Sequence, residues 1–251
     1  MKTITKILLA AASVAGLTAT AANAQDWGSL SATFAVESDY RFRGISQNSR
    51  EATPEVGLNW TLPQGFYASL WSAKTNWGGN NPSFELDIYG GKHFDLGGTD
   101  LNIEAYYYSY PDAKVWFPGA HTSSYYETIV QLSHTFGPLS VTVTGTNSPQ
   151  WSIVGGTGWY TSGMASYALT DWLSVSGTVG HQWVDTTLLK PNNYTHWDLG
   201  ATATWKSLAV DARYVATDIG KANCSTYWMG TKNACQAGFK AMLTYTVASF
   251  P

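Results

Sequence analysis

Charged residues are scarce in this chain, and long apolar runs are missing. Asp, Glu, Lys and Arg make up 12% of the 251 residues, about half of their share in an average soluble domain. No segment approaches the roughly 18 consecutive apolar residues that indicate a transmembrane helix, and the mean hydropathy is slightly negative. The sequence therefore favours neither an ordinary soluble domain nor a helical membrane protein.

Basic patches and lysine-rich runs are also missing, so the sequence does not support nucleic-acid binding. Aromatic residues, in contrast, are plentiful, with 12 Trp and 15 Tyr. Few charges, many aromatics and moderate hydropathy suit a membrane β-barrel with an apolar belt, aromatic girdles and a polar lumen.

The first 24 residues indicate a secretory signal peptide. Lys2 and Lys6 precede the apolar run Ile7–Leu17, and Ala22-Asn23-Ala24 supplies an Ala-x-Ala cleavage site. Cleavage after Ala24 leaves one expected domain, residues 25–251. It removes two of the 14 basic residues and none of the 17 acidic ones, so the formal net charge changes from −3 to −5.

Twelve stretches of the remaining chain are predicted to be strands, and short and long connections alternate between them. The short connections are Leu62–Gly65, Asp95–Asp100, Gly137–Leu139, Leu169–Asp171 and Lys206–Ser207. The long ones are Gly44–Pro54, Asn76–Ser83, Pro111–Ser124, Asn147–Thr157, Val184–Thr195 and Asp218–Gln236. This alternation is typical of bacterial outer-membrane barrels. We therefore expect an all-β, 12-stranded antiparallel up-and-down transmembrane β-barrel in the outer membrane, with outer-membrane lipids and the barrel-assembly machinery as partners.

Side chains of a barrel strand alternate between lipid and lumen, so parity in the sequence predicts facing. Charge on the lipid face would cost about 2–4 kcal/mol at the midplane. In the first strand this assigns one parity to lipid: Leu30, Ala32, Phe34, Val36, Tyr40 and Phe42. The strands near Phe66–Ala73 and Trp159–Ala168 alternate poorly, and their facing stays open.

The same parity test, applied strand by strand, predicts which charged side chains line the lumen. The acids are Glu37, Asp39, Glu55, Glu85, Asp87, Glu104, Glu127, Asp198 and Asp211, and the bases are Arg41, Arg43, Arg213 and Lys240. This excess of acids predicts a channel for small solutes or ions with a modest preference for cations. If the charges pair and fill the barrel, the alternative is a plugged structural or surface-interaction barrel without transport.

The chain contains only two cysteines, Cys224 and Cys235, both in the last long connection. Because exported proteins meet an oxidising compartment, we expect a disulfide between them. In the chain-entropy model such a bond stabilises the loop by on the order of 3 kcal/mol. No CxxC motif occurs and no histidine flanks the pair, which disfavours a metal or redox role.

Catalytic motifs are absent from the sequence, since neither GxSxG nor HExxH occurs. Ser133 and His134 are adjacent and would face opposite sides of a strand, so they cannot form a nucleophile–base pair. Glu85 and Asp87 are two apart on one face, which is common in any charged lumen. We expect no enzyme and no cofactor; an outer-membrane lipid-modifying enzyme is the least favoured alternative. Tryptophans in the long connections fit loop packing or an aromatic girdle better than sugar stacking: Trp77, Trp116, Trp151 and Trp228.

At the top of the first strand stands the segment Ser38-Asp39-Tyr40-Arg41-Phe42-Arg43-Gly44-Ile45-Ser46-Gln47. This segment resembles the opening signature of the TorF family of porin-like bacterial proteins, once grouped as proteins of unknown function. The similarity extends over nearly the whole mature chain, although only this motif is specific: it continues through Gly65-Phe66-Tyr67-Ala68, Glu85-Leu86-Asp87-Ile88-Tyr89-Gly90-Gly91, residues 104–110 and the cysteines. The resemblance implies an outer-membrane porin-like barrel and brings no catalytic residues or defined substrates. One departure is Pro251 after Phe250, which moreover has lumen parity unless the last strand carries a bulge.

Overall fold

The computed structural model of the chain describes residues 28–78, 81–114, 120–189, 192–227 and 233–250. The predicted signal peptide, residues 1–24, lies outside these residues, as do Trp116 and Trp228. In the described part, no helix is long and apolar enough to cross a membrane.

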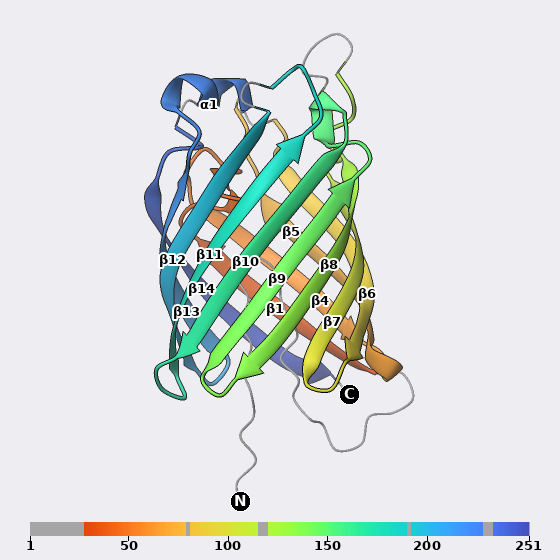
Figure 1. Cartoon of the computed structure of the whole chain (residues 1–251), viewed down its shortest axis with the longest axis vertical. Coiled ribbons are helices and arrows are strands. Elements are labelled where there is room, and N and C mark those ends of the chain that lie inside the picture. Colours follow the sequence, from red (N-terminus) through yellow and green to blue (C-terminus); the bar gives the residue numbers. More distant parts are fainter. Residues whose placement is uncertain (1–27, 79–80, 115–119, 190–191, 228–232, 251) are drawn as a thin grey trace, which may run out of the picture.

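Twelve strands of the described residues form one closed antiparallel barrel (Figure 1). Each strand pairs with its neighbours along the barrel, and the first strand closes the barrel by pairing with the last. The predicted up-and-down architecture is thereby confirmed. The strands are β1 (Ser29–Glu37), β4 (Thr53–Thr61), β5 (Phe66–Lys74), β6 (Phe84–Asp95), β7 (Thr99–Ser109), β8 (Tyr125–Phe136), β9 (Leu139–Ser148), β10 (Gly158–Ala168), β11 (Leu173–Val184), β12 (Asn193–Trp205), β13 (Leu208–Thr217) and β14 (Gly238–Phe250).

Short turns lie at one end of the barrel and long connections at the other (Figure 1). The 3-10 turn η1 (Pro63–Gly65) sits in a short connection, and η2 (Ser152–Val154) and the helix α1 (Lys221–Tyr227) sit in long ones. The connection from β1 to β4 also carries a small hairpin of β2 (Arg41–Phe42) and β3 (Ile45–Ser46). This arrangement matches the alternation predicted from the sequence.

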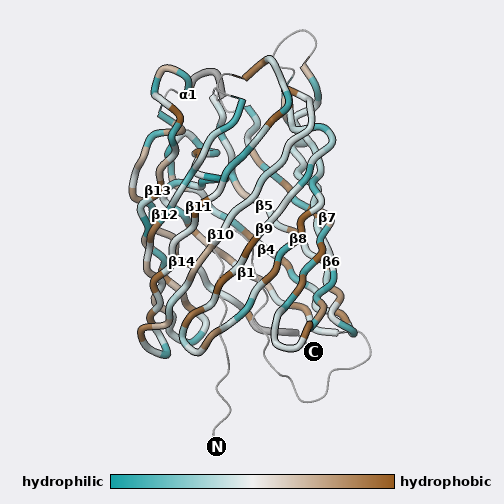
Figure 2. Tube along the Cα trace, in the orientation of Figure 1, coloured by the Kyte–Doolittle hydropathy of each residue, from teal (hydrophilic) through white to brown (hydrophobic). Residues whose placement is uncertain are grey.

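The outer wall is apolar and the inner wall polar, as strand parity predicts. Figure 2 shows hydrophobic residues along the wall and hydrophilic residues gathered towards the end with the long connections. Ala32 keeps outward parity but is buried, because it is short and lies between its strand partners Leu58 and Val247. Large outward side chains are exposed: Phe34, Val36, Ile88, Tyr126, Val130, Leu132, Trp197, Leu199, Val210, Phe239 and Leu243.

The structure settles the facing of the two poorly alternating strands. In β5, Phe66 and Leu70 are exposed, whereas the Tyr67 hydroxyl donates hydrogen bonds to lumen groups. In β10, Trp159 is exposed and Met164 is buried. The pattern was weak because the outward positions of β10 include the small residues Thr161, Gly163 and Ala165.

Two side chains expected to face lipid, Tyr40 and Phe42, lie inside the barrel instead. The Tyr40 hydroxyl donates a hydrogen bond to Glu85, and the Phe42 ring packs against the ring of Tyr108. The prediction was wrong because β1 ends at Glu37, after which residue parity no longer reports membrane facing. At the other end of β1, the register with β14 shifts at a bulge between Leu30 and Ala32, as the position of Phe250 required.

Candidate functional site

Residues 38–52 leave the end of β1 and fold into the barrel as a segment that we call the inserted segment. Its tip is the two-residue turn of the β2–β3 hairpin, Arg43 and Gly44. Both have positive φ, 47° and 85°, as the favoured two-residue hairpin turns require. A Cβ at Gly44 would lie 2.7 Å from side-chain atoms of His196 and Thr217, so the turn also needs glycine for space.

The Arg43 side chain reaches the wall opposite β1. In the closed strand order β9 lies directly across from β1, and the partners of Arg43 come from β8 to β11. Its Nη1 and Nη2 donate to Oε1 and Oε2 of Glu127 at 3.0 and 2.5 Å, and Nη1 donates to Gln182 Oε1 at 2.5 Å. Nη2 also donates to Thr146 Oγ1 at 3.4 Å, and the guanidinium carbon lies 4.0 Å from the Tyr160 ring centroid. The inserted segment therefore spans the lumen from wall to wall.

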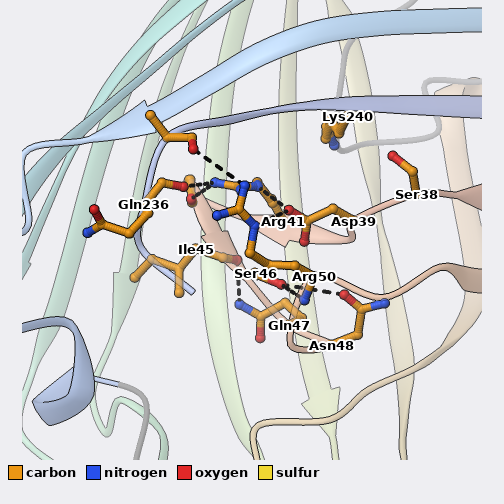
Figure 3. A network of polar contacts seen from close by, with 12 residues as sticks. Ser38, Asp39, Arg41, Ile45, Ser46, Gln47, Asn48, Arg50, Gln236 and Lys240 are labelled. Carbon is orange, nitrogen blue, oxygen red and sulfur yellow. Dashed lines mark hydrogen bonds and ion pairs between the residues drawn. The ribbon is translucent and has the colours of Figure 1, made fainter. Parts of the chain in front are cut away.

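A second arginine holds the base of the inserted segment (Figure 3). Arg41 Nε donates to Asp39 Oδ2 at 2.7 Å, and Nη1 donates to the carbonyl oxygens of Gly44 and Gln236 at 3.2 and 2.9 Å. The backbone N–H of Ser46 donates to the Ala234 carbonyl at 2.9 Å. Two of these contacts tie the inserted segment to the last long connection, residues 218–237.

The last long connection carries the predicted disulfide, and Cys224–Cys235 is confirmed. Both cysteines are buried, and the Thr217 hydroxyl donates to the Cys235 carbonyl at 2.9 Å. Ala234 and Gln236, which contact the inserted segment, flank Cys235 in the chain. The disulfide therefore restrains the backbone that holds the base of the inserted segment.

Tyrosine hydroxyls donate hydrogen bonds to the acids on the wall formed by β6 and β7, although Asp87 Oδ1 is buried without a hydrogen-bond partner in the described part of the chain. Glu85 accepts hydrogen bonds from Tyr40 at 3.1 Å and from Tyr110 at 2.8 Å, and Asp87 accepts one from Tyr106 at 2.8 Å. Tyr106 also belongs to a contiguous array of tyrosine rings across β6, β7 and β8, with centroid distances of 4.3–4.6 Å between successive members: Tyr89, Tyr106, Tyr108 and Tyr125. Among the described residues, four lumen acids form no ion pair: Glu55, Glu85, Asp87 and Glu104.

Basic residues are concentrated on the other side of the lumen, on β13 and β14. Arg213 donates to Asp211 through Nε and Nη2 and to Asp198 through Nη1, each at 2.6 Å. Lys240 pairs with Glu37. The barrel wall is thus asymmetric, with unpaired acids on β4, β6 and β7 and ion-paired clusters on β12 to β14 and at the end of β1.

The half of the barrel near the short turns is lined largely by small hydroxyl side chains. Ser133 and Thr142 share a hydrogen bond of 2.9 Å, and Thr135 and Ser140 share one of 3.0 Å. His134, next to Ser133, instead contacts Thr99 Oγ1 at 2.8 Å. This half is therefore polar and lacks the inserted segment, which occupies the half near the long connections.

The structure assigns the predicted lumen residues to two kinds of position. Asp39, Arg41 and Arg43 belong to the inserted segment and not to a strand, a correction to the expected continuation of β1. Inward strand positions hold Glu37, Glu55, Glu85, Asp87, Glu104, Glu127, Asp198, Asp211, Arg213 and Lys240. Within the described ranges, no group of three or more His, Cys, Asp or Glu is arranged to hold a metal ion.

Sequence analysis missed the neutral partners of Arg43. Gln182 and Thr146 have the inward parity of their strands, which was a usable signal, although neither was among the predicted lumen residues. Tyr160 lies in the strand near Trp159–Ala168, whose poor alternation left its facing open. Trp77 and Trp151 are buried, which agrees with loop packing.

Solved structures with the same fold include the KdgM porin in complex with disordered oligogalacturonate. It aligns with a TM-score of 0.56 at 8% identity, over 86% of this chain and 98% of the porin chain. A second KdgM porin structure aligns with a TM-score of 0.54 at 9% identity, over the same shares. At such identities the likeness concerns the fold alone.

No curated protein matches the chain. A family model for a bacterial protein of unknown function, Gcw_chp, matches residues 21–250. That description assigns no function, so the porin role implied by the TorF resemblance stays a proposal. The chain belongs to the Gcw_chp family.

Proposed function

We propose that this protein is a porin-like channel of the bacterial outer membrane that passes small solutes or ions, with the inserted segment as its constriction. The observation that supports this best is the way in which Arg43 crosses the lumen. A polar segment held by hydrogen bonds and ion pairs occupies one half of the barrel, and small hydroxyl side chains line the other half. Water can replace such polar contacts at little net cost, unlike the contacts of an apolar plug.

The charge of the lumen supports a modest preference for cations. Glu85, Asp87, Glu104 and Glu55 lack basic partners among the described residues, whereas each lumen base is paired with an acid. In their ionised form these four carboxylates give the lumen a net negative field, and low-dielectric walls concentrate it. Oligogalacturonate, the ligand of the KdgM porin, is a polyanion and would be repelled. We propose neutral or cationic solutes for this chain.

The outer wall supports the membrane location, because a closed barrel with an exposed apolar surface satisfies its backbone groups in lipid. In the proposed orientation of the barrel in the outer membrane, the long connections face the outside of the cell and the short turns face the periplasm. Export through a cleaved signal peptide, residues 1–24, and insertion by the barrel-assembly machinery belong to the same proposal.

Planar bilayer recordings with purified protein test the proposed function. We expect discrete single-channel steps and, in a salt gradient, a reversal potential of the sign that cation preference gives. The preference should weaken as the Debye length falls from about 10 Å at 0.1 M salt to about 3 Å at 1 M. Silent membranes would favour a structural barrel, and lipid hydrolysis by the same preparation would favour an enzyme.

A further inference from the structure

We propose that the wall formed by β8 to β11 carries a binding site for a guanidinium group, which Arg43 fills as an intramolecular ligand. A guanidinium-bearing cationic solute would take the place of Arg43 during passage. The second statement rests on the proposed channel function, whereas the binding site itself does not.

The groups that surround the Arg43 guanidinium all belong to the barrel wall, apart from the adjacent Phe42 ring. Glu127 presents two carboxylate oxygens to two guanidinium nitrogens, and Gln182 adds a third acceptor. Both side chains are at most 1% exposed. A carboxylate that receives two parallel N–H donors matches the planar fork of guanidinium, and the Tyr160 ring face supplies a cation–π contact at 4.0 Å.

Contacts that do not involve Arg43 position these wall groups. Gln182 Nε2 donates to the carbonyl oxygens of Trp159 and Trp183, each at 3.0 Å, which directs its Oε1 towards the guanidinium. The Tyr108 hydroxyl donates to Glu127 Oε2 at 3.3 Å. The site is therefore oriented by the barrel and should persist without its intramolecular ligand.

The Tyr160 ring is held in a similar way. Its hydroxyl lies 2.9 Å from His196 Nε2, and the two rings are stacked with an interplanar angle of 12°. A Cβ at Gly180 would lie 2.5 Å from atoms of both side chains. The glycine thus leaves the space in which this pair fits.

The backbone of Arg43 is strained in the conformation that places its side chain in the binding site. Arg43 has φ of 47° at the tip of a two-pair hairpin, a left-handed conformation that is unfavourable for a residue with a side chain. Strained positions of this kind are concentrated at functional sites. The barrel does not depend on this hairpin for its strand pairing, so the arginine can leave while the wall stays intact.

Chemical complementation tests the site. Arg43→Gly removes the ligand and suits the positive φ, and we expect this variant to bind agmatine, as measured by isothermal titration calorimetry in detergent. Arg43→Gly/Glu127→Gln should bind it at least tenfold more weakly. Diaminobutane, which lacks the planar fork, should also bind at least tenfold more weakly to Arg43→Gly. In the wild type, Arg43 competes, so agmatine should bind at least tenfold more weakly there than to Arg43→Gly.

Arg43→Ala provides a second variant should the glycine variant fail to fold, and circular dichroism with heat-modifiable gel mobility checks folding of each. Equal binding of agmatine and diaminobutane, equal binding with and without Glu127→Gln, or no binding to either folded variant would overturn the inference. Bilayer recordings on the same preparations keep the two proposals apart. Agmatine binding without conductance would support the binding site and contradict the channel function. Conductance without agmatine binding would support the channel function and contradict the binding site.

Discussion

The guanidinium of Arg43 donates two hydrogen bonds to the carboxylate of Glu127, a residue 84 positions away on the opposite side of the barrel. Both partners are largely removed from water, with side-chain exposures of 7% and 1%. Breaking a buried pair on one side typically costs about 3–5 kcal/mol, since the other charge is left uncompensated. This pair therefore decides whether the inserted segment stays across the lumen.

Replacement of Arg41 and Arg43 together by Ser should produce a wider leak. The double variant removes the contact of Arg43 with the far wall and the contact of Arg41 with Gln236, so the inserted segment is held by fewer contacts and is easier to displace. Single-channel conductance should rise severalfold. The relative permeabilities of different cations should change little. Arg50→Ser serves for comparison and should have a smaller effect, because its side chain is one-third exposed, lies 3.8 Å from Asp39 and donates only a long hydrogen bond of 3.4 Å to the Ala237 carbonyl. Unchanged conductance in the double variant would contradict the role of the inserted segment as constriction.

Reduction of the Cys224–Cys235 disulfide should also raise conductance. Loss of the bond removes on the order of 3 kcal/mol of loop stabilisation in the chain-entropy model, and the loop supplies the Ala234 and Gln236 carbonyls that hold the inserted segment. We expect more frequent or larger openings after addition of dithiothreitol. The Cys224→Ser/Cys235→Ser variant should show this behaviour without reductant and should not respond further to it. A reductant effect of equal size on that variant would show that the disulfide is not the cause.

Asp112, in the connection after β7, accepts hydrogen bonds from Ser83, in the connection between β5 and β6. We expect this link between the two connections to depend on pH. Slight burial raises the pKa of Asp112, but hydrogen bonds from Ser83 outweigh it and the pKa lies below its usual value. A carboxyl whose folded-state pKa is depressed contributes stability above its unfolded pKa of about 3.9, and the contribution is lost as the pH falls through the folded pKa.

Limited proteolysis of the connection after β7 measures this contribution. At pH 7, Asp112→Asn should be cleaved faster than the wild type, because the amide accepts weaker hydrogen bonds than the carboxylate. The difference should shrink as the pH is lowered, with an acid-active protease, through the folded-state pKa of Asp112, because the wild-type carboxyl then becomes protonated. A difference that persists unchanged at low pH would indicate that the charge of Asp112 is irrelevant.

Much of the barrel could be predicted because its strands alternate between two solvents. In β6, Glu85 and Asp87 alternate with Leu86 and Ile88, so membrane facing could be assigned directly. In β10 it could not, because the lipid face there includes Gly163 and neighbouring small residues that parity cannot distinguish from lumen residues.

The inserted segment escaped prediction for a different reason. The alternation of aromatic and arginine residues after Glu37 fits a continued strand as well as a hairpin. Only the turn formers Ser38 and Asp39 and the glycine at position 44 indicated the turn. The partners of Arg43 were beyond reach, because Glu127 and Gln182 lie 84 and 139 positions away and meet it only in the closed barrel.

Ion selectivity should depend on the acids that lack basic partners. Glu85→Gln/Asp87→Asn keeps oxygen acceptors for the tyrosine hydroxyls and removes two negative charges from the wall of β6. Reversal potentials at about 0.1 M salt should therefore shift towards those of an unselective channel, and the shift should shrink at about 1 M as screening increases. Glu51→Gln is the matched control, because its side chain is 56% exposed and pairs with the exposed side chain of Lys74, and it should leave the reversal potential unchanged. An equal shift in both variants would mean that the overall charge of the protein, and not the charge of this wall, sets the preference for cations.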